Sequence, residues 1–338
     1  MAPATRLGRI IMGSVPPASR RGEIALLTLS LAVALVIGEG VARLVGSGEG
    51  RSGYAPVRTD RRDRRSVNRA GYRDLERPLS KPEGVRRAVC IGDSFTWGVS
   101  VLFDDAWPQR VERRLSRDRG ERWEAVNLAE AGLNAVQEAS KLASEGFAYE
   151  PDVVVVAYVL NDSEDENAAE ARRAADWVEE QRRPPSASLL DRSALVRLVR
   201  TRVRATVENR RRVEGFRSMY ADDYAGWAAA RRALKAMGGM CRERGVPLVV
   251  AIFPLFGNPL DERYPFAEVH AKVAQAAAEA GARVVDLLPA YRGLDGRLLV
   301  VDGADDEHPN EIAHRIAARA IAQAVDEVVP RPAAGARP

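Results

Sequence analysis

A serine stands where a short apolar run of the sequence ends. Residues 88–91 are apolar and include β-branched side chains, and Gly92, Asp93 and Ser94 follow them directly. Such a run is typical of a buried parallel strand. Because ligands bind beyond the carboxyl ends of the strands in open α/β sheets, Ser94 is a candidate nucleophile. A plain turn, in which the serine hydrogen-bonds its own backbone, would explain the same residues.

A serine nucleophile needs a base within hydrogen-bond reach and a group that orients the base. His308 follows the last predicted strand and precedes the last predicted helix. Pro309 disfavours helical backbone at His308, and Asn310 is a suitable cap for the helix that follows. We therefore expect His308 on a loop at the same end of the sheet as Ser94. Asp305, three residues earlier, is its candidate acid partner.

The other two histidines have less chemical context. His270 falls in a helical segment with no acid at a useful spacing, so we expect a structural role on the surface or partly buried. His314 lies one turn into the last predicted helix and is expected to be a structural hydrogen-bond donor.

Two further residues follow predicted strands at the same edge. Gly132 comes after the second strand, and a glycine lets a backbone N–H approach a reacting oxygen closely. Asn161 comes after the third strand and offers a side-chain amide. Together with the backbone N–H of Ser94, they would supply three donors to an oxyanion.

The elements that position these residues alternate from residue 87 onward. Strands are predicted at residues 88–91, 124–128, 153–158, 247–253 and 283–287, with helices at 107–117, 134–147, 224–244, 266–280 and 311–328. Five strands with intervening helices imply a parallel sheet covered on both faces. Residues 163–222 are charged, rich in arginine and broken by Pro184 and Pro185, and are expected to form an insertion of short helices.

The N-terminal part of the chain predicts a membrane segment. Residues 1–22 form a basic tail, and residues 23–45 are apolar enough for a transmembrane anchor or an uncleaved signal. Glu39 and Arg43 would lie near the far interface, where charged side chains are tolerated. Arginines stand on both sides of the segment, so the positive-inside rule does not decide its orientation. A linker at 46–67, a main domain at 68–329 and a disordered tail at 330–338 would complete the chain.

Composition argues against several classes of function. The net charge is +4 and the pI is about 9.2, but acidic residues lie among the arginines, which does not favour nucleic-acid binding. Cys90 and Cys241 form neither a metal spacing nor a disulfide framework, and both are expected to be buried. The segment 92–98 lacks the lysine of a phosphate-binding loop.

The order of these residues resembles the SGNH (GDSL-type) hydrolase family over about residues 68–328. The entry Asn68-x-x-Gly71-Tyr72-Arg73, the run at 92–98 and His308-Pro309-Asn310-Glu311 resemble membrane-anchored bacterial members in particular. The blocks that carry the resemblance are Gly92-Asp93-Ser94, Gly132, Asn161-Asp162 and Asp305-x-x-His308. The resemblance implies a flavodoxin-like three-layer α/β/α sandwich with a five-stranded parallel sheet, without a metal or organic cofactor. It also implies a catalytic domain outside the cytoplasm.

The resemblance further implies a role for each residue. Ser94 would be the nucleophile and first oxyanion donor, His308 the general base and Asp305 its orienting partner. Gly132 and Asn161 would complete the oxyanion hole. The chain departs from the family pattern at Val159, where glycine is usual, and Asp302 and Asp306 crowd the last block, so only spacing selects Asp305.

Four functions remain open on the sequence alone. The first is a serine esterase that removes short acyl groups, such as acetyl, from an envelope carbohydrate or lipid through an acyl-Ser94 intermediate. An O-acyltransferase of an envelope or exported polysaccharide would use the same residues, as would a lysophospholipase or thioesterase. A non-catalytic scaffold is the least favoured. The expected partners are a small-molecule or glycan ester and the membrane, and the oligomeric state is open.

Overall fold

The computed structural model describes residues 20–46, 67–165, 193–301 and 307–331. The chain divides into two compact units. The N-terminal unit consists of Met1–Arg51 and Pro185–Thr206, and the α/β unit consists of Ser52–Pro184 and Val207–Pro338.

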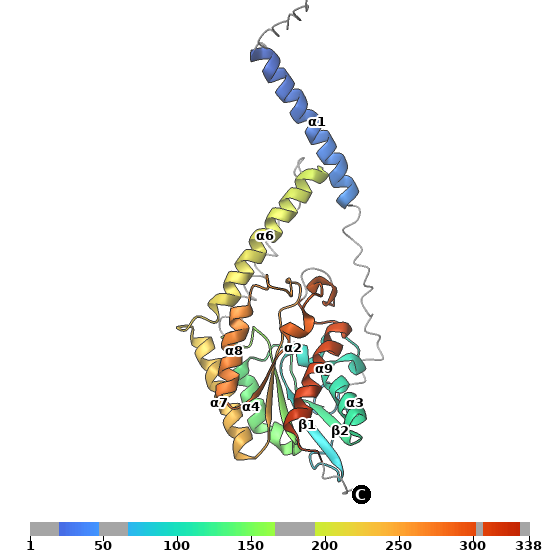
Figure 1. Ribbon diagram of the computed structural model, residues 1–338, viewed down its shortest axis with the longest axis vertical. Coiled ribbons are helices and arrows are strands. Elements are labelled where there is room, and N and C mark those ends of the chain that lie inside the picture. The colour runs from blue at the N-terminus through green and yellow to red at the C-terminus, as the bar shows by residue number, and fades with distance from the viewer. Residues whose placement is uncertain (1–19, 47–66, 166–192, 302–306, 332–338) are drawn as a thin grey trace, which may run out of the picture. The chain divides into compact units, whose positions relative to one another are not determined.

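The α/β unit is built on a five-stranded, wholly parallel sheet with the strand order β2-β1-β3-β4-β5 (Figure 1). The strands are β1 (Val85–Ile91), β2 (Arg122–Asn127), β3 (Val153–Tyr158), β4 (Leu248–Ile252) and β5 (Arg283–Asp286). This order is the flavodoxin-like one, with a reversal of winding between β1 and β3. The predicted fold class is therefore confirmed.

Helices cover both faces of the sheet. On one face, α3 (Trp107–Arg119) packs against α9 (Glu311–Val328), and on the other α7 (Ala225–Glu243) packs against α4 (Ala135–Ser144) and α8 (Ala267–Glu279) (Figure 1). The short helix α2 (Ser94–Trp97) follows β1. Single 3₁₀ turns occupy Phe103–Asp105, Gly146–Tyr149, Leu288–Tyr291 and Gly296–Leu298.

The sheet is the centre of one continuous core. Every residue of β3 and β4 is buried, which explains why these strands are unbroken apolar runs in the sequence. Both cysteines are buried, Cys90 in β1 and Cys241 in α7, as predicted. The predicted bounds of β3 and α9 agree with the structure.

Two sequence predictions need correction. Strand β1 begins three residues earlier than predicted because Arg86 and Arg87 belong to it. The expected insertion of short helices is wrong where the structure describes it, since α6 (Ala194–Ser218) is one helix of 25 residues. Arginine, alanine and leucine are good helix formers, and this stretch has no proline to interrupt it.

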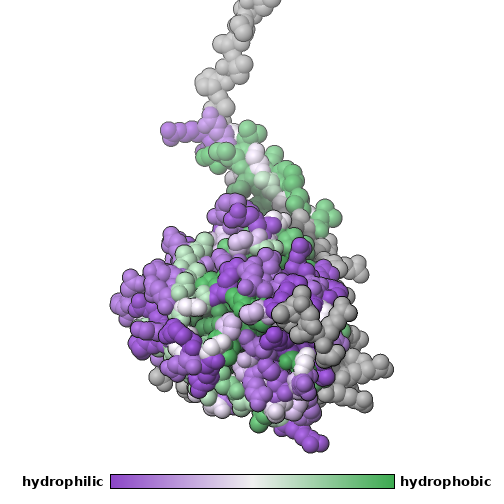
Figure 2. Space-filling view, turned by 60° about the horizontal axis from the view of Figure 1, so that its bottom comes forward, coloured by the Kyte–Doolittle hydropathy of each residue, from purple (hydrophilic) through white to green (hydrophobic). Residues whose placement is uncertain are grey.

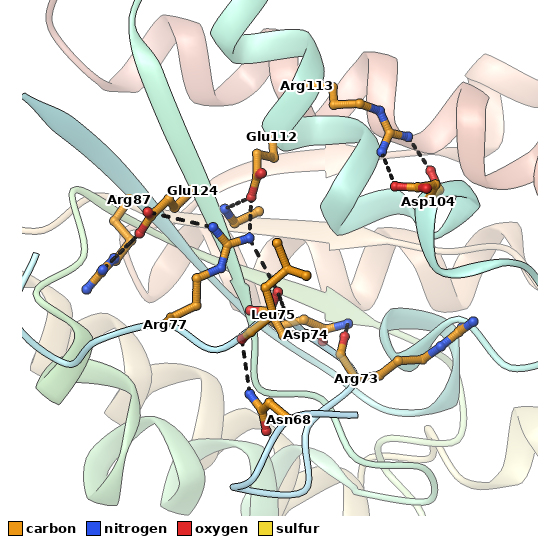
Figure 3. Close-up of polar contacts among 12 residues, drawn as sticks. Asn68, Arg73, Asp74, Leu75, Arg77, Arg87, Asp104, Glu112, Arg113 and Glu124 are labelled. Atoms are coloured by element: carbon orange, nitrogen blue, oxygen red, sulfur yellow. Dashed lines mark hydrogen bonds and ion pairs between the residues drawn. The ribbon is translucent and has the colours of Figure 1, made fainter. Parts of the chain in front are cut away.

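A network of buried ion pairs links β1 and β2 to the segment before them (Figure 3). Arg87, which is fully buried, donates from Nε and Nη2 to Glu124 Oε2 at 3.1 and 2.8 Å. Arg77 Nη2 lies 2.6 Å from Glu112 Oε2 and 3.4 Å from Asp74 Oδ1. Burying these arginines is tolerated because each guanidinium is paired with a carboxylate, which offsets the cost of removing the charge from water.

The N-terminal unit contains α1 (Arg20–Gly46), whose side chains are mostly exposed and apolar (Figure 2). Among the described residues, this is the one helix whose length and composition suit a membrane crossing. An N-terminal signal sequence has the same properties. The N-terminal half of α6, up to Thr206, belongs to this unit as well.

Candidate active site

Ser94 lies at the carboxyl end of β1, where the chain turns into α2. The turn is held by Asp93, whose Oδ1 accepts the Phe95 N–H at 2.9 Å and so caps the helix. A Cβ on Gly92 would lie 2.1 Å from Thr96 Oγ1, so only glycine fits at that position. Ser94 itself is half-buried, whereas its neighbours Asp93 and Phe95 are buried.

Arg73 fastens the segment that follows Ser94, and sequence reasoning missed it. Its guanidinium is buried and donates to the backbone carbonyls of Trp97, Gly98 and Val101. Gly98 adopts φ 81° and ends α2 in the left-handed region, which favours glycine. The segment from the end of α2 to Val101 is thus held by hydrogen bonds to one guanidinium, and not by the hydrogen bonds of a helix or strand. The signal in the sequence was the entry Asn68-x-x-Gly71-Tyr72-Arg73, which forms a hydrogen-bonded turn but did not indicate what Arg73 contacts.

His308 meets Ser94 from the other end of the chain. Its Nε2 lies 3.0 Å from Ser94 Oγ, within hydrogen-bond distance. The Phe95 ring flanks the imidazole, with ring centroids 5.6 Å apart. Because the two residues are 214 positions apart, only the parallel fold brings them together.

The loop that carries His308 is anchored on both sides. The Val301 N–H donates to the His308 carbonyl at 3.1 Å, and Val300 forms an antiparallel bridge with Pro309. Asn310 caps α9, as predicted, by accepting from the backbone N–H groups of Ile312 and Ala313. Its amide also donates to backbone carbonyls of the preceding turn.

Of the remaining predicted site residues, one lies beside the Ser94 turn, one lies in an exposed loop and one lies outside the described residues. Asn161 lies just beyond β3, and its Nδ2 donates to Asp93 Oδ2 at 3.2 Å, which brings it beside the Ser94 turn. Gly132 lies in the exposed loop between β2 and α4 with φ 85°, and a Cβ added there would have no neighbour within 4 Å. Asp305, with Asp302 and Asp306, lies outside the described residues.

Three carboxyl groups are buried behind the Ser94 turn. Burial raises the pKa of Asp93, although the Phe95 N–H and the Asn161 amide oppose this. Burial raises the pKa of Asp162 well above its usual range, and the nearby carboxyl of Glu138 adds to the effect. Burial also raises the pKa of Glu138 well above its usual range, and the nearby carboxyl of Asp93 raises it further. These shifts favour the neutral carboxyl, and sequence reasoning gave no role to Glu138.

The two other histidines are structural, but the details differ from the prediction. His270 is buried and has an acid partner after all, since its Nδ1 lies 2.8 Å from Asp286 Oδ1 at the end of β5. His314 accepts at Nδ1 from the Trp107 N–H at 3.2 Å, whereas a donor was expected. Burial lowers its pKa to about 3, so the ring is neutral at ordinary pH.

No group of three or more metal-ligating side chains occurs within the part of the chain that the structure describes.

The sequence matches the GDSL-like lipase/acylhydrolase family over residues 90–316. No curated protein matches the chain. Similar solved structures include TesA (16% identity, 72% of this chain and 99% of that chain, TM-score 0.44). A catalytic mutant of Axe2, an acetylxylan esterase from Geobacillus stearothermophilus, has 16% identity over 71% of this chain and 94% of that chain (TM-score 0.44). The lipase Lip_vut3 from a goat rumen metagenome has 15% identity over 71% and 97% (TM-score 0.40).

Proposed function

Because the chain belongs to the GDSL-like lipase/acylhydrolase family, and is therefore an ester hydrolase, we propose that it acts as a serine esterase through Ser94 and His308. The observation that carries this proposal is the 3.0 Å separation of Ser94 Oγ and His308 Nε2 at the carboxyl edge of the sheet. A neutral imidazole at this distance can accept the serine proton.

In the first half of the reaction, Ser94 Oγ attacks the carbonyl carbon of the ester while His308 Nε2 takes the hydroxyl proton. The resulting oxyanion receives hydrogen bonds from the backbone N–H of Ser94 and Gly132 and from the Asn161 amide. The tetrahedral intermediate collapses, the C–O bond to the alcohol breaks, and His308 returns its proton to the leaving alkoxide. The acyl group is left on Ser94.

In the second half, His308 accepts a proton from a water molecule that attacks the acyl carbon. A second tetrahedral intermediate forms in the same oxyanion hole. As it collapses, the bond between the acyl carbon and Ser94 Oγ breaks, His308 returns its proton to Oγ, and the carboxylic acid is released. Asp305 would orient the imidazole by accepting from Nδ1–H.

The substrate is proposed to be a short acyl ester, acetyl first, on an envelope carbohydrate or lipid. The apolar helix α1 supports this location, since a retained anchor would hold the enzyme at the membrane. We propose that α1 is that anchor and that the catalytic domain lies outside the cytoplasm.

Hydrolysis of p-nitrophenyl acetate by the full-length chain in detergent tests the serine. We expect Ser94→Ala to lower kcat/KM by about 10⁴–10⁶-fold, because the attack and the proton transfer act as a unit. Ser144→Ala, an exposed hydroxyl at the end of α4, is the matched control and should leave the rate unchanged. Equal rates for Ser94→Ala and the wild type would sink the proposal.

Product analysis with an added glycan acceptor separates hydrolysis from acyl transfer, which would use the same acyl-Ser94. Free carboxylic acid as the sole product supports the esterase. Acylated glycan as the main product would reassign the enzyme to the O-acyltransferase class and keep Ser94 and His308 in their roles.

A further inference from the structure

The far end of α1 is joined to the beginning of α6 by one carboxylate. Glu39 accepts from the Ser193 hydroxyl at 2.7 Å and from the backbone N–H groups of Ala194 and Leu195 at 2.9 and 3.0 Å. The first N–H groups of a helix lack intrahelical partners, and an anion there is favourable. Glu39, from another helix, therefore caps the first turn of α6 together with Ser193, whose Oγ accepts from the Val196 N–H at 3.2 Å.

Gly38 lets the two helices approach each other closely. A Cβ at this position would lie 3.1 Å from Leu195 Cδ2, tighter than ordinary van der Waals contact. Glu39, through its hydrogen bonds, and Gly38, through the close packing that it allows, together hold the start of α6 against α1. A leader that is cut away would have no use for such a contact, so the contact favours a retained α1.

The N-terminal half of α6 then presents an apolar stripe to the outside. Leu195, Val199 and Val203 recur every four residues and so lie on one face of the helix. Val199 and Val203 are 52% and 58% exposed. The stripe begins at the residue that packs on Gly38 and is therefore continuous with the apolar surface of α1.

Basic residues flank this stripe. Residues 194–206 include four arginines and no acidic residue. At 3.6 residues per turn, Arg200 and Arg202 project on opposite sides of the Val199–Val203 line. An exposed apolar stripe between arginines is typical of a helix that lies in the headgroup region of a membrane. A groove on a partner protein would not explain the position of this stripe at the end of an apolar spanning helix.

We propose that residues 194–206 of α6 form a second membrane-contact element that binds anionic phospholipid. Val199 and Val203 enter the boundary between headgroups and acyl chains, and Arg200 and Arg202 contact lipid phosphates. The inference rests on the proposed role of α1 as an anchor.

The test uses full-length protein reconstituted in phosphatidylcholine vesicles with or without phosphatidylglycerol. An environment-sensitive fluorophore is attached at Val203→Cys or, as the matched control on the opposite helix face, at Thr201→Cys. The native Cys90 and Cys241 are buried and do not compete for the label in the folded protein. We expect lipid-borne nitroxide to quench the label at position 203 in the anionic vesicles and to spare the label at 201.

The charge requirement is tested with the double variant Arg200→Gln/Arg202→Gln. Each lost charge should weaken the contact of α6 with the anionic surface by about fivefold. Hydrolysis of a soluble ester should not change, because neither arginine belongs to the active site. Equal quenching at 201 and 203, or quenching at 203 that ignores lipid charge, would overturn the inference.

Flotation of the vesicles after a carbonate wash reports on α1 separately. A chain that does not float would contradict the anchor and, with it, this inference. A chain that floats but shows an unquenched label at 203 would contradict the α6 contact alone. In either case, the result of the Ser94→Ala assay stands independently.

Discussion

The strand β1 buries acidic groups in two different ways at its two ends. Near its start, Arg87 is fully buried and pairs with Glu124 across the β1–β2 ladder. Just beyond its end, Asp93, Glu138 and Asp162 are buried with no ion pair to lysine or arginine among the described residues, and their pKa values are raised. The first arrangement keeps charges in the protein interior. The second favours uncharged carboxyls.

The difference fits a structural role for the start of β1 and the proposed catalytic role of Ser94 at its end. The Arg87 guanidinium also donates to the backbone carbonyls of Leu79 and Tyr149, so the ion pair ties three segments together. Beside Ser94, an ionised carboxylate would oppose the negative charge of an oxyanion, whereas a neutral one would not. Carboxyl groups that are desolvated without an arginine therefore suit the proposed role of Ser94 as the nucleophile.

The largest expected effect comes from removing the buried cation. Arg87→Met should lower the free energy of unfolding by about 3–5 kcal/mol, because the buried Glu124 would lose its nearest cation and both hydrogen bonds to Oε2, while Arg77 and Arg122 lie farther away at 3.8 and 3.3 Å. Denaturant unfolding measures this. Arg297→Met, which removes a 74% exposed arginine paired with Asp295, should cost less than about 1 kcal/mol. Similar losses for both variants would remove the distinction between the buried network and surface pairs.

The regular part of the fold could be predicted because its cause is local. The apolar runs of β3 and β4 and the cap at Asn310 are visible in the sequence. Position at the carboxyl ends of parallel strands, together with the family resemblance, then singled out Ser94 and His308.

What could not be predicted depends on pairing between distant residues. Arg87 hid the start of β1 because a buried arginine is tolerated only with Glu124 opposite, 37 positions away. Asp286 reaches His270 only through the β5–α8 packing. Glu138 carries no local signal, since an acid on an amphipathic helix is ordinarily solvated.

The pH dependence of stability tests whether the buried carboxyl groups near Ser94 are neutral. Burial raises the pKa of Glu138 in the folded state, so its contribution to stability is complete below the unfolded pKa of about 4.3. That contribution is lost as the pH rises from there through the raised folded pKa. Glu138→Gln removes the titrating group. The variant should therefore become more stable relative to the wild type as the pH rises. The difference between their free energies of unfolding should grow by up to about 1.4 kcal/mol per pH unit above pH 5.

Denaturant titrations at pH 5, 6 and 7 measure this difference. Glu243→Gln, which removes an exposed acid on α7, is the surface control for the loss of one carboxyl group. A difference between Glu138→Gln and the wild type that stays constant with pH would mean that Glu138 is ionised in the folded protein, contrary to the comparison.

The smallest expected effect comes from an exposed arginine that pairs with Glu124, the same carboxylate that Arg87 contacts. Comparing the two arginines separates the effect of burial from the effect of charge. Besides Arg87, Glu124 pairs with Arg77 at 3.8 Å and with Arg122, whose Nη2 lies 3.3 Å from Oε1 but whose side chain is 69% exposed. Arg122→Gln should cost less than about 0.5 kcal/mol, since water screens the pair, and the loss should disappear in 1 M salt. Because Arg87 and Arg122 contact the same carboxylate, a loss from Arg122→Gln as large as that from Arg87→Met would mean that charge, and not burial, sets the strength of this network.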